Sequence, residues 1–167
     1  MVPSRVVLGV VLLGLSGQAY AASSWETFTS KYSGCSVEYP TDIFSPSRQI
    51  EADGATSFTS GLAEASMVIA GGSNDKSASV ADIVRTYLKQ VEGESITYRR
   101  QEQEWAVYSG HRGGLIYYMK VILSRDRRQA CVLELRYPPA NKLDLDLVVS
   151  RMSNSLRLPH TAGLAAR

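Results

Sequence analysis

Two stretches toward the carboxyl end of the chain alternate apolar and polar residues with a period of two. The first covers residues 115–123 and aligns on one face Leu115, Tyr117, Met119, Val121 and Leu123. The second covers residues 129–137 and aligns on one face Cys131, Leu133, Leu135 and Tyr137, with Glu134 and Arg136 on the other. Such alternation predicts antiparallel strands that bury one face and expose the other. The residues between the two strands, 125–128, form a hairpin-like connection.

Shorter stretches of the same kind, separated by turn residues, predict five further strands. They cover residues 35–39, 55–60, 65–70, 96–103 and 104–110. Pro40 ends the first of them, and residues 111–114 form a second hairpin-like connection. Gly71 and Gly72 open a segment that superficially resembles a phosphate-binding loop. It lacks the spacing of such a loop and is predicted to be a flexible connector.

Apolar residues at helical spacing predict two helices. The first begins at Val80, after a capping box formed by Ser79 and Asp82, and ends at Gly93. Its apolar stripe contains Val80, Ile83, Val84, Tyr87, Leu88 and Val91. The second covers residues 142–156 behind an Asn141 cap, and its stripe contains Leu145, Val148, Val149, Met152 and Leu156. Trp25, Phe28 and Tyr32 also recur at helical spacing, which predicts a short helix or turn.

These elements predict an α+β fold, with an antiparallel β-sheet of about six to seven strands flanked by two main helices. A chain of 167 residues, 44% apolar and 20% charged, is too apolar for a disordered protein and has room for one domain of ordinary size. We expect that domain to cover residues 22–158, followed by a disordered tail over residues 159–167.

Residues 1–21 have the features of a secretory signal peptide. Arg5 supplies the positive charge, residues 6–15 form an uncharged apolar run, and Ala19-Tyr20-Ala21 provides the small residues of a cleavage site. The apolar run is too short for a membrane-spanning helix, which needs roughly 20 residues. We therefore expect cleavage near Ala21–Ala22, a periplasmic or secreted protein, and no stable membrane insertion afterwards.

Export changes the interpretation of the two cysteines. Cys35 and Cys131 both fall in phase with apolar, core-facing positions of predicted strands. An even number of cysteines in an oxidising compartment favours one disulfide. Two buried free thiols that pack as small apolar side chains are the alternative. The cysteines and the two distant histidines lack the spacing of a zinc site, so no metal site is predicted, and no cofactor.

The charge balance argues against nucleic acid as a partner. The net charge is +2, whereas proteins that bind phosphate backbones are normally much more basic. The arginines nevertheless gather in a few segments, which makes them a candidate surface for an acidic partner: Arg99, Arg100, Arg112, Arg125, Arg127 and Arg128. Glu102, Glu104 and Asp126 lie among them, so the alternative is a set of charges that keeps the hairpins soluble.

Aromatic residues are concentrated in the predicted central strands, namely Tyr98, Trp105, Tyr108, Tyr117 and Tyr118. Neighbours such as Tyr117 and Tyr118 must point to opposite sides of a sheet. Part of the set therefore packs under the helices. The rest is available to line an exposed face that contacts protein or carbohydrate, although core packing alone also explains such residues.

Arrangements that would support catalysis are weak. His111 follows Ser109 by two residues, and Asp126 lies in a later loop, but the strained turn of a nucleophilic serine is missing. An exposed loop histidine is the better interpretation. Glu102 and Glu104 would share a strand face, and paired carboxylates can serve as acid and base in a glycosidase, but solvated charges that discourage edge-to-edge pairing are the better interpretation. No catalytic residue is assigned.

The order of the apolar and turn residues resembles one family. The resemblance rests on Phe28, Tyr32, the Val37–Pro40 strand end, Phe44, Asp53-Gly54, Phe58 and a last helix that ends over residues 151–157. This layout is similar to the PsbP-like domains, whose fold is shared with the Mog-type Ran-binding proteins and with small exported bacterial proteins of no assigned function. The resemblance implies a binding module, as in the photosystem extrinsic subunits and the small-GTPase partner. No residue here matches a ligand or partner motif of either branch.

The sequence therefore predicts an exported, non-catalytic binding or accessory module that associates with an envelope protein or complex. A periplasmic hydrolase that uses His111 as its base is the alternative hypothesis.

Overall fold

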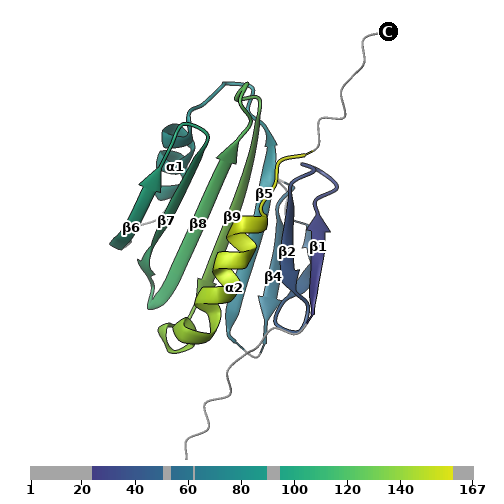
Figure 1. The fold of residues 1–167 in the computed structure, drawn as a ribbon, viewed down its shortest axis with the longest axis vertical. Coiled ribbons are helices and arrows are strands. Elements are labelled where there is room, and N and C mark those ends of the chain that lie inside the picture. Colours follow the sequence, from purple (N-terminus) through teal and green to yellow (C-terminus); the bar gives the residue numbers. More distant parts are fainter. Residues whose placement is uncertain (1–23, 51–53, 62, 90–94, 160–167) are drawn as a thin grey trace, which may run out of the picture.

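The fold is built around one large antiparallel sheet (Figure 1). The computed structural model describes residues 24–50, 54–61, 63–89 and 95–159. Seven strands pair in the spatial order β3 (Ser45–Ile50), β4 (Thr56–Ser60), β5 (Ala65–Ser73), β9 (Gln129–Tyr137), β8 (Leu115–Leu123), β7 (Trp105–Arg112) and β6 (Ser95–Gln101). This is the predicted α+β fold, with a sheet of the expected size.

One face of the sheet carries a helix and a hairpin. The hairpin joins β1 (Trp25–Thr29) and β2 (Ser36–Pro40), and α2 (Lys142–Ser155) packs beside it after a single 3₁₀ turn at Pro139–Asn141. The larger hydrophobic core lies between these elements and strands β4, β5 and β9. Arg151 fastens the hairpin to α2, because its guanidinium lies 4.0 Å from the Trp25 ring and 3.0 Å from the Glu38 carboxylate.

The other face carries α1 (Val80–Lys89), which covers β7 and β8 (Figure 1). A second, smaller core forms there, and it contains Val80, Val84, Ala106, Tyr108, Met119, Val121, Leu123 and Val132. The helix begins as predicted. The Asp82 carboxylate accepts hydrogen bonds from the Ser79 hydroxyl and amide, and the Asp82 amide donates to the Ser79 hydroxyl.

The two covers lie on opposite faces and over opposite halves of the sheet. As a result, the apolar faces of the two clearest strands point in opposite directions. Tyr118 of β8 pairs directly with Leu135 of β9, and residues directly paired across strands share a face. Leu135 therefore faces α2, whereas Tyr117 and Met119 face the side of α1. Both alternations were predicted correctly, but they belong to two different cores.

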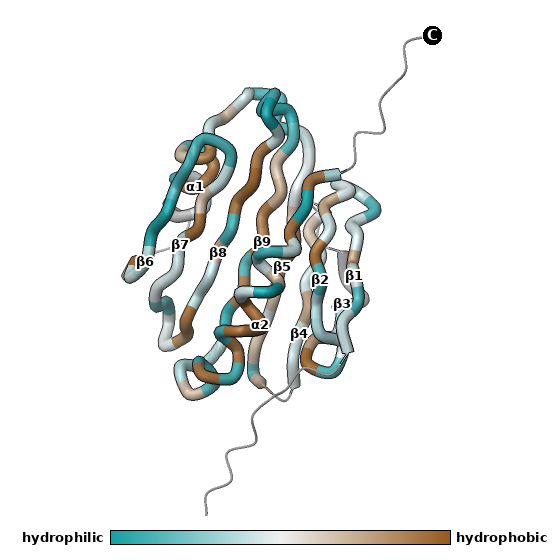
Figure 2. The backbone as a smooth tube through the Cα atoms, viewed as in Figure 1, coloured by the Kyte–Doolittle hydropathy of each residue, from teal (hydrophilic) through white to brown (hydrophobic). Residues whose placement is uncertain are grey.

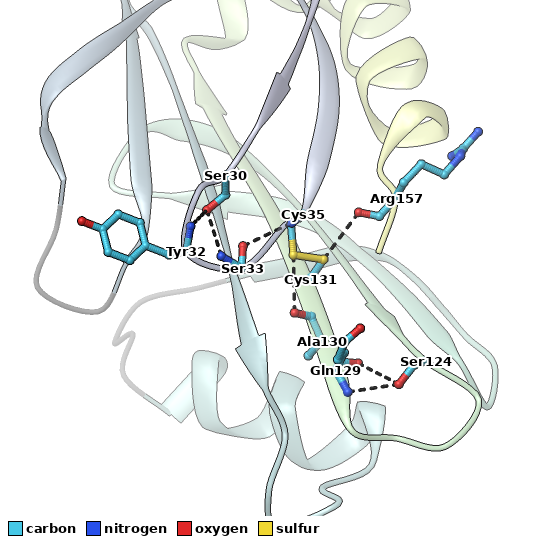
Figure 3. The surroundings of a disulfide bond; sticks show 9 residues. All are labelled: Ser30, Tyr32, Ser33, Cys35, Ser124, Gln129, Ala130, Cys131 and Arg157. Atoms are coloured by element: carbon cyan, nitrogen blue, oxygen red, sulfur yellow. Dashed lines mark hydrogen bonds between the residues drawn. A yellow bond between two sulfur atoms is a disulfide. The ribbon is translucent and has the colours of Figure 1, made fainter. Parts of the chain in front are cut away.

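A disulfide bond joins Cys35, just before β2, to Cys131 of β9, so the pairing that the sequence favours is present (Figure 3). The two Cα atoms are 5.8 Å apart, both residues are fully buried, and 96 positions separate them in the chain. Because Cys35 belongs to the hairpin layer and Cys131 to the large sheet, the bond ties these two layers together.

Gly71 makes room for this bond, which corrects the prediction for residues 71–75. A Cβ at this position would lie 2.3 Å from Cys35 Sγ and 2.6 Å from the Ala130 carbonyl oxygen. Strand β5 continues through Gly71 and Gly72 to Ser73 and pairs with β9 throughout. The glycines are therefore part of a strand that must approach the disulfide closely, and the flexible connector predicted there does not begin until Asn74.

Two other predictions at the start of the chain are wrong. Residues 25–29 form strand β1 and not a helix, whereas Tyr32 lies in the turn that follows. Trp25 packs against Arg151 of α2, and Phe28 packs against Phe58 of the sheet. Both aromatic residues of the strand are therefore in contact with other elements, and their spacing of three residues resembles that of a helix. Strand β3 was not predicted at all, since Pro46 and polar neighbours disfavour a strand. It lies at the edge of the sheet, where proline is tolerated.

Three further boundaries differ. Glu102 and Glu104 lie in the turn between β6 and β7, so they do not share a strand face. His111 lies within the last residues of β7, not in the loop, although its side chain is exposed as predicted. Asn141 occupies the predicted N-cap position of α2 but makes no side-chain capping hydrogen bond; its side-chain amide donates to the Ala63 carbonyl at 2.5 Å and holds the helix start against another segment.

The rest of the helix and hairpin predictions is confirmed where the structure describes it. Residues of the α2 stripe are buried, and Gly113 and Gly114 turn β7 into β8 at positive φ. Residues 1–21, Gly93 and nearly all of the predicted tail, 160–167, lie outside the described residues.

Removal of the disulfide should lower the free energy of unfolding by about 4 to 5 kcal/mol. This value follows from the conformational entropy that the unfolded chain loses when a disulfide closes a loop of this length. We expect the Cys35→Ala/Cys131→Ala variant to unfold at a lower urea midpoint, with the extrapolated free energy of unfolding reduced by that amount. Wild-type protein unfolded with and without a reductant is the matched control, and a loss below about 1 kcal/mol would contradict the structural role given to the bond.

Candidate functional site

The half of the sheet that α2 leaves uncovered carries a groove. Its walls and floor contain Tyr98, Arg100, Trp105, Tyr118 and Lys120, which we call the aromatic groove. It runs over β6, β7 and β8 beside the carboxyl end of α2, on the face opposite to α1. The cavity measures about 560 Å³. Three aromatic rings and two cations therefore meet at one open surface.

Strand register explains why these side chains meet. Val107 of β7 pairs with Lys120 on one side and with Arg100 on the other, and Ser109 likewise pairs with Tyr118 and Tyr98. Since directly paired residues share a face, all of these side chains project toward α2. The short side chains of Val107 and Ser109 on β7 leave a depression between the larger residues of β6 and β8.

The floor of the groove is fixed to the end of α2. The Tyr118 hydroxyl lies 2.6 Å from Ser153 Oγ, and Lys120 Nζ donates to the Ser153 carbonyl at 2.8 Å. This carbonyl belongs to the last turn of the helix, where a cation is favourable. The two bonds hold the floor residues in one arrangement without a ligand.

Burial shifts the pKa of both floor residues. It raises the pKa of the Tyr118 hydroxyl, although the hydrogen bond to Ser153 acts in the opposite direction. Partial burial lowers the pKa of the Lys120 ammonium, and the nearby Arg157 charge lowers it further.

The outer wall of the groove is aromatic and basic. The Arg100 guanidinium lies 5.1 Å from the centre of the Trp105 ring, which is a cation–π arrangement. Tyr98 is 52% exposed beside them. Glu104 is the acidic residue of this cavity, and it lies 3.8 Å from Arg125. A flat aromatic surface with neighbouring cations suits an acidic or amphipathic partner.

The groove continues into a second cavity of about 490 Å³ along α2, and Tyr98 and Tyr118 line both. His111 and Ser109 lie in this second part, opposite Lys142 and Asp146 of the helix. Asp146 is already engaged there, by an ion pair with Lys142 and a hydrogen bond from Tyr137.

The serine, histidine and aspartate weighed as a catalytic arrangement are not brought together. His111 lies near the β7–β8 turn, whereas Asp126 lies in the turn at the far end of β8. The nine residues of β8 separate these ends by about 25 to 30 Å. The Asp126 carboxylate instead accepts hydrogen bonds from the Ser124 hydroxyl and the Arg128 amide in its own turn.

The six arginines of the candidate surface occupy three places. Arg100 and the turn that contains Arg125, Arg127 and Arg128 lie at the Trp105 end of the groove, where Glu102 and Glu104 approach Arg100 and Arg125. Arg99 points to the α1 face, 5.6 Å from the Tyr108 ring. Arg112 ends β7 near the opposite turn. Only part of the set is therefore adjacent to the groove.

The sequence had pointed to the three aromatic residues of the groove but not to Lys120. The signal was present: within residues 115–123, Lys120 is the one charged side chain, and it shares its face with Tyr118 and Ile122. A lysine on an otherwise apolar face of a central strand predicts a nearby acceptor. That acceptor is a helix-end carbonyl, which local sequence does not reveal.

Comparisons with known proteins bear on the fold. No protein-family model matches the chain, and no curated protein sequence matches it. Among solved structures, the Ran-binding protein Mog1p of Saccharomyces cerevisiae superimposes with a TM-score of 0.55 at 11% identity, over 81% of this chain and 95% of that one. The cyanobacterial PsbP of Synechocystis sp. PCC 6803 does so with 0.55 at 12%, over 90% and 98%. The chain therefore has the PsbP/Mog-like fold, as its sequence resemblance implied.

Two negative findings apply to the described residues alone. Within these ranges, no cluster of three or more histidine, cysteine, aspartate or glutamate side chains is arranged to hold a metal ion. Neither of the helices there is long and apolar enough to cross a membrane.

Replacement of Tyr118 by phenylalanine should test the anchor between the groove floor and α2. We expect Tyr118→Phe to lower stability by about 1 kcal/mol at neutral pH, the typical net contribution of one hydrogen bond. A raised pKa in the folded state means that this contribution is complete below about pH 10 and is lost as pH rises through the folded pKa.

The difference in urea unfolding free energy between wild type and Tyr118→Phe should therefore be constant below about pH 10 and shrink as the pH is raised above that value. Tyr137, whose pKa burial also raises, is present in both proteins and cancels from the comparison. A difference that stays constant over this range would contradict the assignment.

Proposed function

We propose that this protein is a non-catalytic binding module that docks an envelope protein through the aromatic groove. One observation carries the proposal. Half of one face of the large sheet lies outside the cover of α2, and the side chains that project there are Tyr98, Arg100 and Trp105. Aromatic and arginine side chains grouped on an open surface are enriched at protein interfaces.

Two features support the expected location in the cell envelope. Residues 1–21 have the charge, apolar run and small-residue cleavage site of a secretory signal peptide. The Cys35–Cys131 disulfide suits an oxidising compartment such as the periplasm or the exterior. A partner reached after export is therefore another envelope or secreted protein.

Basic residues at the Trp105 end of the groove supply the complementary charge. Arg100 lines the groove, and the β8–β9 turn adds Arg125, Arg127 and Arg128. The neighbouring glutamates approach Arg100 and Arg125 at 3.9 and 3.8 Å, which are loose and exposed ion pairs of small energy. An acidic partner surface can replace these contacts at little cost.

The fold relatives agree with a binding role. One of them is named as a Ran-binding protein. The hydrolase hypothesis, in contrast, has His111 without the carboxylate partner weighed for it, because Asp126 lies at the other end of β8.

Tyr98 provides the most direct test of the groove. After cross-linking in cells and purification of the processed protein, we expect mass spectrometry to find one near-stoichiometric envelope partner. Tyr98→Ala should reduce its recovery by about tenfold, the effect of a well-placed aromatic interface residue. Tyr32→Ala is the matched control, since Tyr32 is an even more exposed tyrosine on the β1–β2 turn. Equal recovery with both variants would refute docking at the groove.

His111 separates the two hypotheses. His111→Ala should leave recovery of the partner within about twofold of wild type, because His111 is not one of the groove residues that we expect to dominate docking. Hydrolytic turnover by the purified protein that this substitution abolishes would instead favour the hydrolase.

Reversal of the charges at Arg125, Arg127 and Arg128 should weaken partner recovery more at low salt than at high salt.

A further inference from the structure

Strand β6 closes the large sheet at one edge and is exposed along its whole length. Each of its residues, Ser95–Gln101, is exposed, and β7 is its neighbour in the sheet order. In Figure 2 most of β6 is drawn in the hydrophilic colour. An edge strand presents main-chain amide and carbonyl groups that another extended segment can pair with. The opposite edge, β3, is blunted by Pro46 and an irregular register.

The register shows which main-chain groups of β6 point outward. The Glu102 amide donates to the Trp105 carbonyl at 2.8 Å, next to the turn. Hydrogen-bonded and non-hydrogen-bonded pairs alternate along an antiparallel ladder. Arg100 and Tyr98 therefore direct their main-chain groups toward β7, and Arg99 and Gln101 direct theirs toward the open edge.

A bulge limits the length of the usable edge. The register of β6 against β7 shifts between Ile96 and Tyr98. Gly110 permits this, because a Cβ there would lie 1.8 Å from the Ser95 carbonyl oxygen. From Tyr98 to Gln101 the pairing with β7 is regular. An incoming strand would find four residues of uninterrupted template, with the bulge at its end.

The side chains along this template carry positive charge on both faces of the sheet. Arg99 lies over Tyr108 on the α1 face, and Arg100 lies over Trp105 on the groove face beside Tyr98. No acidic residue interrupts Ser95–Gln101. Two copies of β6 paired about the arginines would set like charges against each other, which disfavours a second copy of this chain as the occupant.

We propose that an acidic, extended segment of the partner adds to the sheet as an eighth strand along Tyr98–Gln101. This inference rests on the proposed function and specifies the partner's chemistry. Arg99 and Arg100 point to opposite faces, so the segment needs two adjacent acidic residues, one for each face. A neighbouring apolar or aromatic residue falls opposite Tyr98 on the groove face. The predicted pattern is thus two consecutive acids flanked by an apolar residue.

A library of random dodecapeptides displayed on phage tests this pattern without knowledge of the natural partner. Selection on the folded, disulfide-bonded protein should enrich peptides with two adjacent acidic residues beside an apolar one. Their binding should weaken by about tenfold or more between low and high salt. Amide hydrogen exchange of the complex should slow at Arg99 and Gln101, whose amides we assign to the open edge.

Gln101→Pro removes one outward amide, and proline is tolerated where the amide faces away from the neighbouring strand. It should weaken peptide binding about tenfold or more, whereas Gln101→Ala, which keeps the amide, should stay within about twofold. Circular dichroism checks that both variants are folded. The exchange measurement on the wild-type protein decides the matter if Gln101→Pro does not fold.

The outcomes separate this inference from the proposed function. Peptides that bind equally well to Gln101→Pro, or that leave exchange at Arg99 and Gln101 unchanged, would overturn the eighth strand. The same holds for selected peptides without acids, and for a selection that enriches nothing. If the cross-linked partner still depends on Tyr98 in any of these cases, the binding module stands and only its edge-strand mode is refuted.

Discussion

The arrangement on which the rest of the structure depends is a single sheet covered on opposite faces at opposite ends. α2 and the β1–β2 hairpin cover strands β4, β5 and β9 on one side, and α1 covers β7 and β8 on the other. The Cys35–Cys131 bond holds the first cover in place, with Gly71 leaving the space it needs. Because neither cover extends over β6 and β7 on the α2 side, the groove follows from the placement of the covers. The groove therefore needs no additional helix or loop to form it.

The carboxyl end of α2 joins this scaffold to the groove. The Ser153 carbonyl accepts a hydrogen bond from Lys120, and the Ser153 hydroxyl is hydrogen-bonded to the Tyr118 hydroxyl. The position of the helix end therefore determines the positions of the floor residues. Lys120 is held by a favourable helix terminus even though burial opposes its charge. The outer wall, in contrast, comes from Tyr98 and Arg100 of the exposed edge strand β6 and from Trp105 at the start of β7. A rigid floor and an accessible edge are what a docking surface for an extended segment requires.

Local sequence predicted the elements with clear periodicity and failed where contacts across the fold decide. The strands around Tyr117 and Leu135 and the α2 stripe were found because each buries one face. That the two strand faces belong to different cores depends on the register of β8 with β9, which no local pattern records. The segment that contains β1 was predicted to be a short helix or turn because Trp25, Phe28 and Tyr32 recur at helical spacing. Of the site, the aromatic residues were recognised, whereas Lys120 was missed because its acceptor is a distant helix end.

The central claim is that the exposed side chains of the groove are occupied in the cell envelope. Oxidative footprinting of aromatic side chains, in intact cells and on the purified protein, measures this directly. The account predicts that Tyr98 and Trp105 are protected in cells relative to the purified protein, while Tyr32, which is 67% exposed on the far hairpin, is labelled equally in both. Equal labelling of Tyr98 and Trp105 in the two preparations would contradict it.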